Sequence, residues 1–158
     1  EWLVSAGMLN RVYNGSKMEH PLAAFDKLEQ FKLFVFDTGL LKYMAGVDNS
    51  AILLKADYQF KGPLTENYLL QQLRGQFEVV PRYFSDKTSE IDFVLQHGTE
   101  IIPVEAKCGD DKSAPSFKRY VLDHEPDHAL RFSKRGYRID AFITNIPLYL
   151  ATKTKDLL

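Results

Sequence analysis

The chain has 158 residues, enough for one domain with a sizeable hydrophobic core. Apolar residues make up 45% of the sequence and charged residues 26%, a balance typical of a soluble globular protein. Because the net charge is only −1, there is no overall basic bias, and any contact with nucleic acid must rest on a local patch.

Several features of other protein classes are missing from the sequence. Cys108 is the only cysteine, which excludes an internal disulfide and agrees with a reducing cytoplasm, where we expect the protein to reside. There is no run of about 18 apolar residues to span a membrane, and no charged-then-apolar leader. The chain opens at Glu1 without an initiating Met, so we expect a piece of a longer protein.

The first 25 residues predict a short helix followed by a β-ribbon. Gly7 is expected to end the helix, and Asn14-Gly15 is a dipeptide typical of a hairpin turn. A helix followed by a ribbon is typical of the end of a winged helix-turn-helix. We therefore assign residues 1–30 to a fragment of a preceding winged-helix-like segment and residues 31–158 to the main domain.

Residues 32–36 predict a buried strand, because they are rich in aromatic and β-branched side chains. Asp37 follows this strand and is expected to cap a helix that stops at Gly46. A capping role explains Asp37 better than a catalytic role does. Residues 51–61 remain ambiguous between structural classes.

A second helix is predicted over residues 64–74, because a Gly-Pro pair breaks the chain before it and a glycine follows its end. Its apolar stripe contains Leu69, Leu70 and Leu73, and Glu66 lies on the same stripe. One interpretation is that Glu66 favours the helix dipole from the first turn. The other is that the helix packs over the sheet and points Glu66 at carboxylates of the following strands.

Three strands in meander are predicted over residues 78–84, 90–96 and 100–107. A Gly-X pair beginning at Gly98 suits a type II′ turn between the last two strands. Because Pro103 cannot donate a ladder hydrogen bond, its strand should have a free edge or a bulge there. This turn predicts a register with one wholly apolar side, in which the facing pairs are Leu95 and Ile102, Phe93 and Val104, and Ile91 and Ala106.

Asp92 and Glu105 are expected directly opposite each other on the other side of this hairpin, and Lys107 shares the face of Glu105. Opposed carboxylates repel and destabilise a strand pair unless something offsets their charge. A divalent cation would offset it, with help from Lys107. The alternative is that both carboxylates face water, and spacing alone leaves the two interpretations open.

The C-terminal part predicts a helix over residues 114–122 with Ser113 as a candidate N-cap, a last strand over residues 139–144 and an apolar tail over residues 146–151. Basic residues of this region are candidates for contacts with nucleic-acid phosphates. These candidates are Lys118, Arg119, Arg131, Lys134 and Arg135. The alternative is that they form an ordinary solvated face.

Common catalytic motifs are absent from the sequence. It contains no GxxxxGK[ST], GxGxxG, HExxH, CxxC or GxSxG, so this chain carries no P-loop ATPase site. His124 and His128 are four residues apart, but Pro126 between them undermines the helical geometry of a zinc pair. Cys108 has no histidine placed to activate it, and we expect an inert thiol.

The carboxylate pair and the lysine match the pattern D-x(n)-E-x-K. Two carboxylates from Asp92 and Glu105, with the backbone carbonyl of Ala106 as a third oxygen ligand, suit Mg²⁺ or Mn²⁺. Such an ion polarises a phosphodiester oxygen and activates a bound water, while Lys107 stabilises the developing charge or orients the water. Glu66 is expected to support the metal through a water molecule or through contact with one of the metal's ligands.

Five stretches of the sequence resemble a known family. They are FVFDTGLL, LTENYLLQQL, YFSDKTSEIDFVL, IIPVEAK and the closing IPLYL. Together they resemble the DUF4143 domain over residues 2–150, and the order of the acidic and basic residues resembles the PD-(D/E)XK nuclease superfamily. One departure from the superfamily pattern is that Ile91, rather than proline, precedes Asp92.

The resemblance implies an α/β fold with a PD-(D/E)XK restriction-endonuclease-like core, a central mixed β-sheet flanked by helices. It also implies that Glu66, Asp92, Glu105 and Lys107 occupy the superfamily's active-site positions. The chain would then be the C-terminal part of a prokaryotic AAA-type ATPase, and its partner would be the N-terminal, ATP-binding portion of the same polypeptide.

The expected function is therefore a Mg²⁺- or Mn²⁺-dependent nuclease acting on DNA or RNA. The alternative is a catalytically silent accessory domain that binds nucleic acid or a protein partner of the ATPase. A structural or oligomerisation module is a third interpretation.

Overall fold

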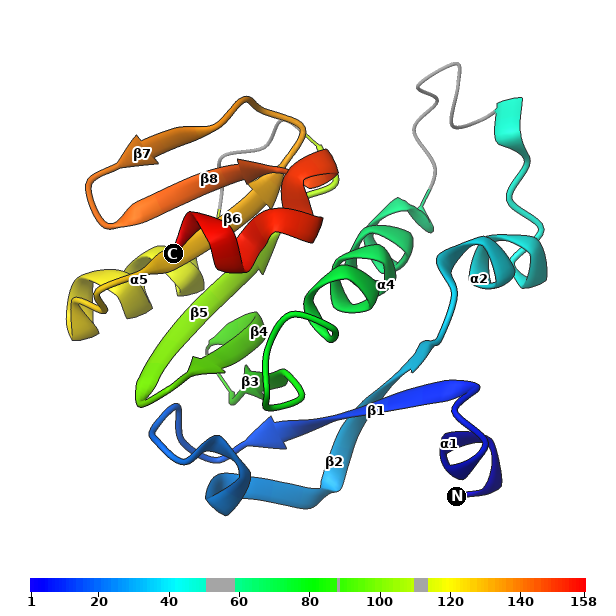
Figure 1. The fold of residues 1–158 in the computed structure, drawn as a ribbon, viewed down its shortest axis with the longest axis horizontal. Coiled ribbons are helices and arrows are strands. Elements are labelled where there is room, and N and C mark those ends of the chain that lie inside the picture. Colours follow the sequence, from blue (N-terminus) through cyan, green and yellow to red (C-terminus); the bar gives the residue numbers. More distant parts are fainter. Residues whose placement is uncertain (51–58, 88, 110–113) are drawn as a thin grey trace.

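The computed structural model describes residues 1–50, 59–87, 89–109 and 114–158. Strands in these ranges form one eight-stranded sheet with the order β2-β1-β3-β4-β5-β6-β8-β7 (Figure 1). Pairing is parallel between β1 and β3, β5 and β6, and β6 and β8, and antiparallel elsewhere. The strands are β1 Leu9–Gly15, β2 Asp26–Val35, β3 Arg82–Ser85, β4 Glu90–His97, β5 Glu100–Ala106, β6 Ala129–Ser133, β7 Arg138–Asp140 and β8 Ile143–Pro147.

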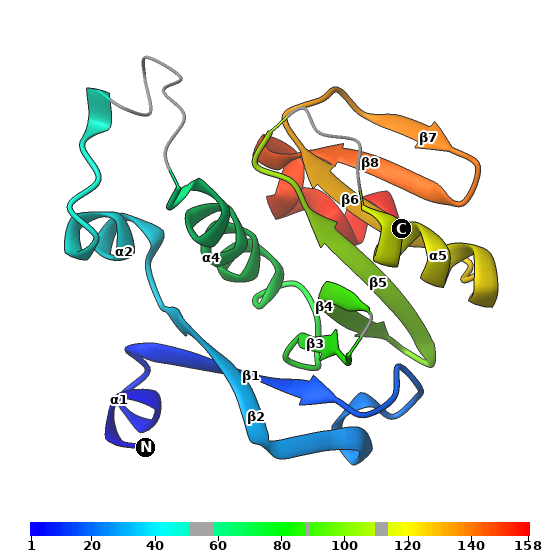
Figure 2. The same cartoon turned by 180° about the vertical axis from the view of Figure 1, so that it is seen from behind.

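Helices cover both faces of the sheet, which confirms the predicted α/β class with a central mixed sheet (Figures 1 and 2). Helix α4 and the 3₁₀ segment η2 pack on one face, and α5 packs on the other. The helical elements are α1 Trp2–Ser5, η1 Leu22–Phe25, α2 Thr38–Met44, α4 Lys61–Leu73, α5 Pro115–His124 and η2 Leu148–Leu157. Within the described ranges, no helix is long and apolar enough to cross a membrane.

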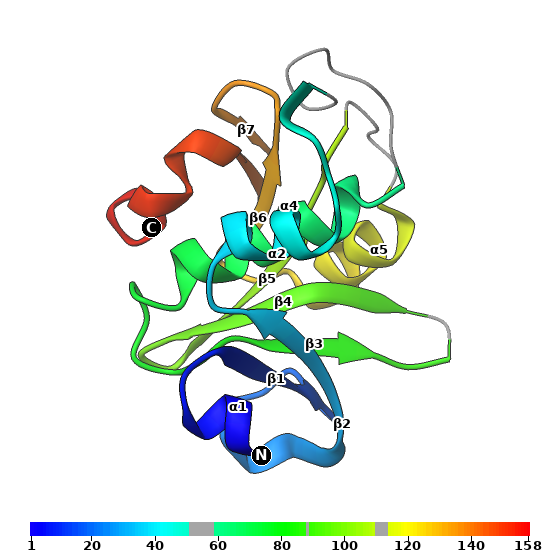
Figure 3. The ribbon, with the colours of Figure 1, turned by 90° about the vertical axis from the view of Figure 1, so that its right-hand side faces the viewer.

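The sheet separates two apolar clusters. Under α4, the predicted stripe of Leu69, Leu70 and Leu73 is buried against side chains of β4, β5, β6 and β8. Under α5, Phe117 and Val121 pack on the opposite face. Seen from the side, the sheet runs between these helices, with the β1–β2 ribbon at one end (Figure 3). The central strands are apolar on both faces because both faces are covered.

The predicted meander and hairpin are confirmed. Gly98 has a φ of +60° at the turn, and both Leu95–Ile102 and Phe93–Val104 are paired. The prediction of one wholly apolar side is wrong at Ile91, which packs in the cluster under α5 instead of with Phe93. In a regular strand residues two apart share a face, so the strand is irregular at the intervening Asp92.

Pro103 lies where β5 is paired on one side only. It is opposite Val94 of β4, and the pairing of β5 with β6 begins one residue later, at Val104. Because Pro103 has no described pair with β6, its missing N–H removes no hydrogen bond from that ladder. This agrees with the predicted free edge.

The N-terminal ribbon joins the main sheet. Gly7, with a φ of +74°, follows α1 as predicted. The expected turn at Asn14-Gly15 is wrong, because both residues end β1 and pair with Lys27 and Asp26 of β2. The parallel pair of Asn14 with Tyr83 then links this ribbon to β3. The domain boundary assigned at residue 30 falls inside β2.

Two other predictions about strands are wrong in their details. Residues 32–36 do not form a buried strand, because β2 is the edge of the sheet and leaves Leu33 half exposed. The single strand predicted over residues 139–144 is a hairpin of β7 and β8, with Ala141 at a φ of +52° between them.

The predicted N-cap of α2 is confirmed, since the Leu40 N–H donates to Asp37 Oδ1 at 2.7 Å. Ser113 lies outside the described residues.

Candidate active site

The two predicted carboxylates lie together at one end of the β4–β5 hairpin. The last described pair of this ladder is Phe93 with Val104, and Asp92 and Glu105 come one residue beyond it. The Ala106 N–H donates to Asp92 Oδ2 at 2.7 Å, so the backbone of β5 holds the Asp92 carboxylate. Glu105 is only 6% exposed, which excludes the interpretation that both carboxylates simply face water.

Lys107 lies beside the carboxylate pair, as its position on the strand predicts. Its Nζ is 2.6 Å from Glu105 Oε1. Its backbone N–H donates to the carbonyl of Phe132, so the first residue after β5 is tied to β6. Lys107 therefore supplies positive charge where the two carboxylates would otherwise repel each other.

The carboxylates at this site are harder to ionise than ordinary ones. Burial and the neighbouring charge of Asp92 raise the pKa of Glu105 to about 7. Burial also raises the pKa of Asp92, although the Ala106 N–H and the nearby lysines act in the opposite direction. Burial therefore disfavours the charged forms of both carboxyl groups, and the nearby cations do not fully offset this effect.

A small cleft opens beside these side chains. It has a volume of about 220 Å³, and its described lining residues are Glu90, Asp92, Glu105, Lys107 and the residues 114–117 at the start of α5. We call this set the acidic cleft. The first turn of a helix presents unpaired N–H groups and a partial positive charge, which favour an anion at that end. The acidic cleft therefore brings carboxylates, an ammonium group and a helix N-terminus together.

Two charged residues at the edge of this site were missed in the sequence. Lys32 Nζ on β2 lies 3.0 Å from Glu90 Oε1 and 3.7 Å from Glu66 Oε2. Burial acts to lower the pKa of Lys32, but Glu66, Glu90 and Asp92 outweigh it and raise the pKa overall. Glu90 could have been found two positions before Asp92 on the same strand. Lys32 gave no signal, because its partners are distant in the chain.

Glu66 lies beside the site and not in its cleft. It lines a separate pocket with Lys32 at the edge of the sheet. Burial raises the pKa of Glu66, and the charge of Asp92 adds to this rise. The helix α4 thus carries Glu66 toward the carboxylate pair, with the ammonium group of Lys32 near both.

The donor set fits a hard divalent cation only in part. Two carboxylates are a common protein contribution to a Mg²⁺ site, with waters as the remaining ligands. Ala106, the expected third ligand, contacts Asp92 through its N–H. Among the described residues, no group of three or more His, Cys, Asp or Glu side chains is arranged to hold a metal ion. A bound ion would therefore depend on Asp92, Glu105 and non-protein oxygens.

The structure separates the five predicted phosphate-binding residues. Lys118, Arg131 and Arg135 line one pocket together. Arg119 lines another pocket, on the other side of α5, and its Nε lies 3.6 Å from Asp123 Oδ2. Lys134 is exposed. Only the first three therefore form a common site.

Comparison with known proteins identifies a family but no characterised relative. No curated protein and no solved structure matches the chain. Residues 61–150, more than half of the sequence, match the family model described as a domain of unknown function, DUF4143. This match spans α4, the whole acidic cleft and strands β3 to β8. The chain therefore belongs to the DUF4143 family.

Proposed function

We propose that this chain hydrolyses phosphodiester bonds of DNA or RNA with the help of Mg²⁺ or Mn²⁺, and that its fold contains a PD-(D/E)XK nuclease-like core. The main support is the convergence of Asp92, Glu105 and Lys107 on one cleft at the end of a hairpin. A basic group next to two carboxylates suits reactions in which negative charge develops on a phosphoryl group.

Asp92, Glu105 and Lys107 of the acidic cleft have assigned roles in this proposal. Asp92 and Glu105 would hold the metal ion, and water or phosphate oxygens would complete its ligands. When bound, the ion supplies Lewis-acid polarisation of the phosphoryl oxygen and lowers the pKa of a water molecule. Lys107 stabilises the negative charge that develops on the phosphoryl group or orients the attacking water.

Residues around the cleft support these tasks. The start of α5 binds a phosphate oxygen through its N-terminal N–H groups. Lys32 is ion-paired with Glu66 and Glu90, which reduces the repulsion between these carboxylates and Asp92. Glu66 acts through Lys32 and through water rather than by direct contact with the substrate.

The resemblance in sequence supports a wider context for this function. We infer that the chain is the C-terminal part of a cytoplasmic AAA-type ATPase and that the ATP-binding portion of the same polypeptide is its partner. ATP hydrolysis would then take place outside the chain, since its sequence contains no P-loop motif.

Cleavage of plasmid and labelled oligonucleotides in Mg²⁺, Mn²⁺ or EDTA tests the proposal. Wild-type protein should cut DNA or RNA with metal and lose activity in EDTA. Asp92→Asn and Lys107→Ala should each be inactive, while Asp123→Asn, an exposed acidic residue on α5, should retain activity. Cleavage that persists in EDTA, or that the variants of the acidic cleft retain, would contradict the proposal.

A catalytically silent domain that binds nucleic acid is the second candidate. The observation that favours it is the close ion pair of Lys107 with Glu105, which occupies a carboxylate oxygen that a metal would need. In that case the protein should bind oligonucleotides equally well in EDTA and in Mg²⁺ and leave them intact in both. Capture of a protein partner by Asp92→Asn as well as by wild type would point to an accessory role of the same kind.

A further inference from the structure

A second pocket lies on the sheet beyond the acidic cleft. Its volume is about 270 Å³, and we call it the basic pocket. Its described lining residues are Lys118 of α5, Arg131 of β6, Arg135, Arg138 and Asp140 of β7, and Ile143 of β8. Four cationic side chains and one carboxylate therefore share this lining. Guanidinium groups suit phosphate because their planar N–H groups can donate two parallel hydrogen bonds.

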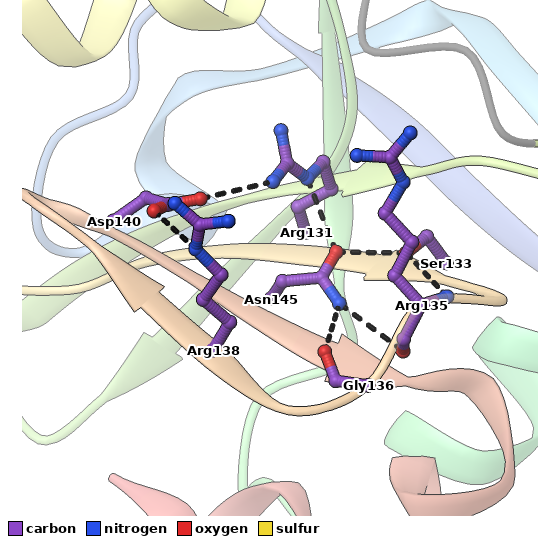
Figure 4. A network of polar contacts seen from close by, with 7 residues as sticks. All are labelled: Arg131, Ser133, Arg135, Gly136, Arg138, Asp140 and Asn145. Atoms are coloured by element: carbon purple, nitrogen blue, oxygen red, sulfur yellow. Dashed lines mark hydrogen bonds and ion pairs between the residues drawn. The ribbon is translucent and has the colours of Figure 1, made fainter.

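A buried amide organises the basic pocket (Figure 4). Asn145 is 2% exposed, and its Oδ1 accepts hydrogen bonds from Arg131 Nε at 3.2 Å and Ser133 Oγ at 2.7 Å. Its Nδ2 donates to the backbone carbonyls of Arg135 and Gly136. Asn145 therefore orients the guanidinium of Arg131 and holds the turn that carries Arg135.

One carboxylate is shared by two of the arginines. Asp140 Oδ1 lies 2.6 Å from Arg138 Nε, and Asp140 Oδ2 lies 3.9 Å from Arg131 Nη2. In Figure 4 dashed lines join Asp140 to both of these side chains. Among the described lining residues, one carboxylate serves two guanidinium groups, so their summed charge is positive.

The basic pocket and the acidic cleft belong to one row of residues across the sheet. Glu105 pairs with Arg131, Arg131 with Asn145, and Asn145 with Arg138. Paired residues on neighbouring strands have Cβ atoms about 5 Å apart, so this row extends about 15 Å from Glu105 to Arg138. Helix α5 borders both ends, with residues 114–117 at the cleft and Lys118 at the pocket.

We propose that the basic pocket binds a phosphate group of a nucleic-acid strand and that another phosphodiester of the same strand lies in the acidic cleft. This deepens the proposed function and rests on it for the identity of the strand. Lys118 and Arg138 contact the bound phosphate, and Arg131 is held in position by Asn145. Arg119 and Lys134 lie outside the site.

Binding of a fluorescein-labelled oligonucleotide in EDTA tests the pocket separately from catalysis. Anisotropy is measured at several salt concentrations for wild type, Lys118→Ala, Arg138→Ala and Arg119→Ala. Arg119 is a matched control because it follows Lys118 on α5 and its side chain is 80% exposed beside Asp123. Lys118→Ala and Arg138→Ala should each weaken binding about 3- to 10-fold and reduce the salt slope by about 0.7 to 0.9. Arg119→Ala should change neither.

The other outcomes contradict this inference. An equal loss in Arg119→Ala would mean diffuse attraction without a built pocket, and no loss in Lys118→Ala and Arg138→Ala would remove the pocket from the binding surface. If inorganic phosphate binds in dependence on Lys118 and Arg138 while the oligonucleotide does not, the ligand is a small phosphate compound and the strand is excluded. Cleavage and its loss in Asp92→Asn test only the proposed function, whereas binding in EDTA tests only the basic pocket. The pocket inference and the proposed function can therefore fail independently.

Discussion

The acidic cleft and the basic pocket share helix α5 and one row of paired residues, but their charges are held in different ways. In the cleft, Asp92 and Glu105 are brought together by a hairpin, and Lys107 compensates them only in part. In the pocket, Arg131 and Arg138 share one carboxylate, and the buried amide of Asn145 holds Arg131 and the turn at Gly136. The cleft thus favours an added cation and the pocket an added anion, and a metal-bound phosphodiester strand offers both.

The largest expected effect separates catalysis from binding. Asp92→Asn should lower the cleavage rate about 1,000-fold, equivalent to about 4 kcal/mol, because it removes a proposed metal ligand. The same variant should bind the labelled oligonucleotide in EDTA as tightly as wild type. Arg138→Ala should show the reverse pattern, with weaker binding and an unchanged rate at saturating substrate. If both variants changed the same quantity, the cleft and the pocket would not be separate functional regions.

The next largest effect concerns Asn145, which holds Arg131 and the turn at Gly136 in the basic pocket. Asn145→Ala should lower the free energy of unfolding by about 3 kcal/mol, because it leaves buried donors and acceptors of Arg131, Ser133 and Gly136 without their partner. Urea unfolding followed by circular dichroism measures this change. Thr144→Ala, at the preceding position of β8, is the matched control and should cost under about 1 kcal/mol. Similar losses in both variants would show that Asn145 has no special part in the pocket.

A pH series tests the raised pKa of Glu105 in the acidic cleft. The pKa of Glu105 in the folded state is about 7, above its ordinary value of 4.5, so the folded state holds its proton to higher pH than the unfolded state does. Its contribution to stability is therefore complete below about pH 4.5 and is lost as the pH rises through 7. This difference corresponds to about 3 kcal/mol.

Glu105→Gln should remove most of that dependence. At pH 8 the variant should be more stable than wild type by about 2 kcal/mol, and at pH 4.5 the two should be nearly equal. Denaturant unfolding at the two pH values measures the difference, and Glu29→Gln, at an exposed position of β2, is the control. A wild type that gains stability between pH 5 and 8 relative to Glu105→Gln would refute a raised pKa.

The two regions also differ in how far the sequence predicts them. The acidic cleft depends on contacts within one hairpin, and the turn at Gly98 sets the pairs Leu95–Ile102 and Phe93–Val104. The positions of Asp92 and Glu105 follow from those pairs. Helical spacing likewise placed Glu66 on the packed face of α4, though it did not reveal that Glu66 lines a pocket outside the cleft.

The basic pocket depends on contacts that no local pattern specifies. Arg131 meets Asn145 only because β6 and β8 pair in parallel, and β7 was hidden inside what the sequence predicted as a single strand. Basic composition alone therefore grouped Arg119 with Lys118, although they line different pockets. Lys32 was missed for the same reason, since 58 residues separate it from Glu90.

The smallest expected effect is the stabilisation of the folded protein by metal. If Asp92 and Glu105 bind Mg²⁺ with a dissociation constant near 1 mM, then about 10 mM Mg²⁺ should add about 1.4 kcal/mol to the free energy of unfolding at pH 8. A thermal melt should show a rise in Tm for wild type and for Arg138→Ala, and none for Asp92→Asn. Because the proposed ion lies in the cleft, variants of the basic pocket should keep the rise. A rise that Asp92→Asn retains, or that Arg138→Ala loses, would place the ion elsewhere and remove the physical basis for assigning cation binding to one region and phosphate binding to the other.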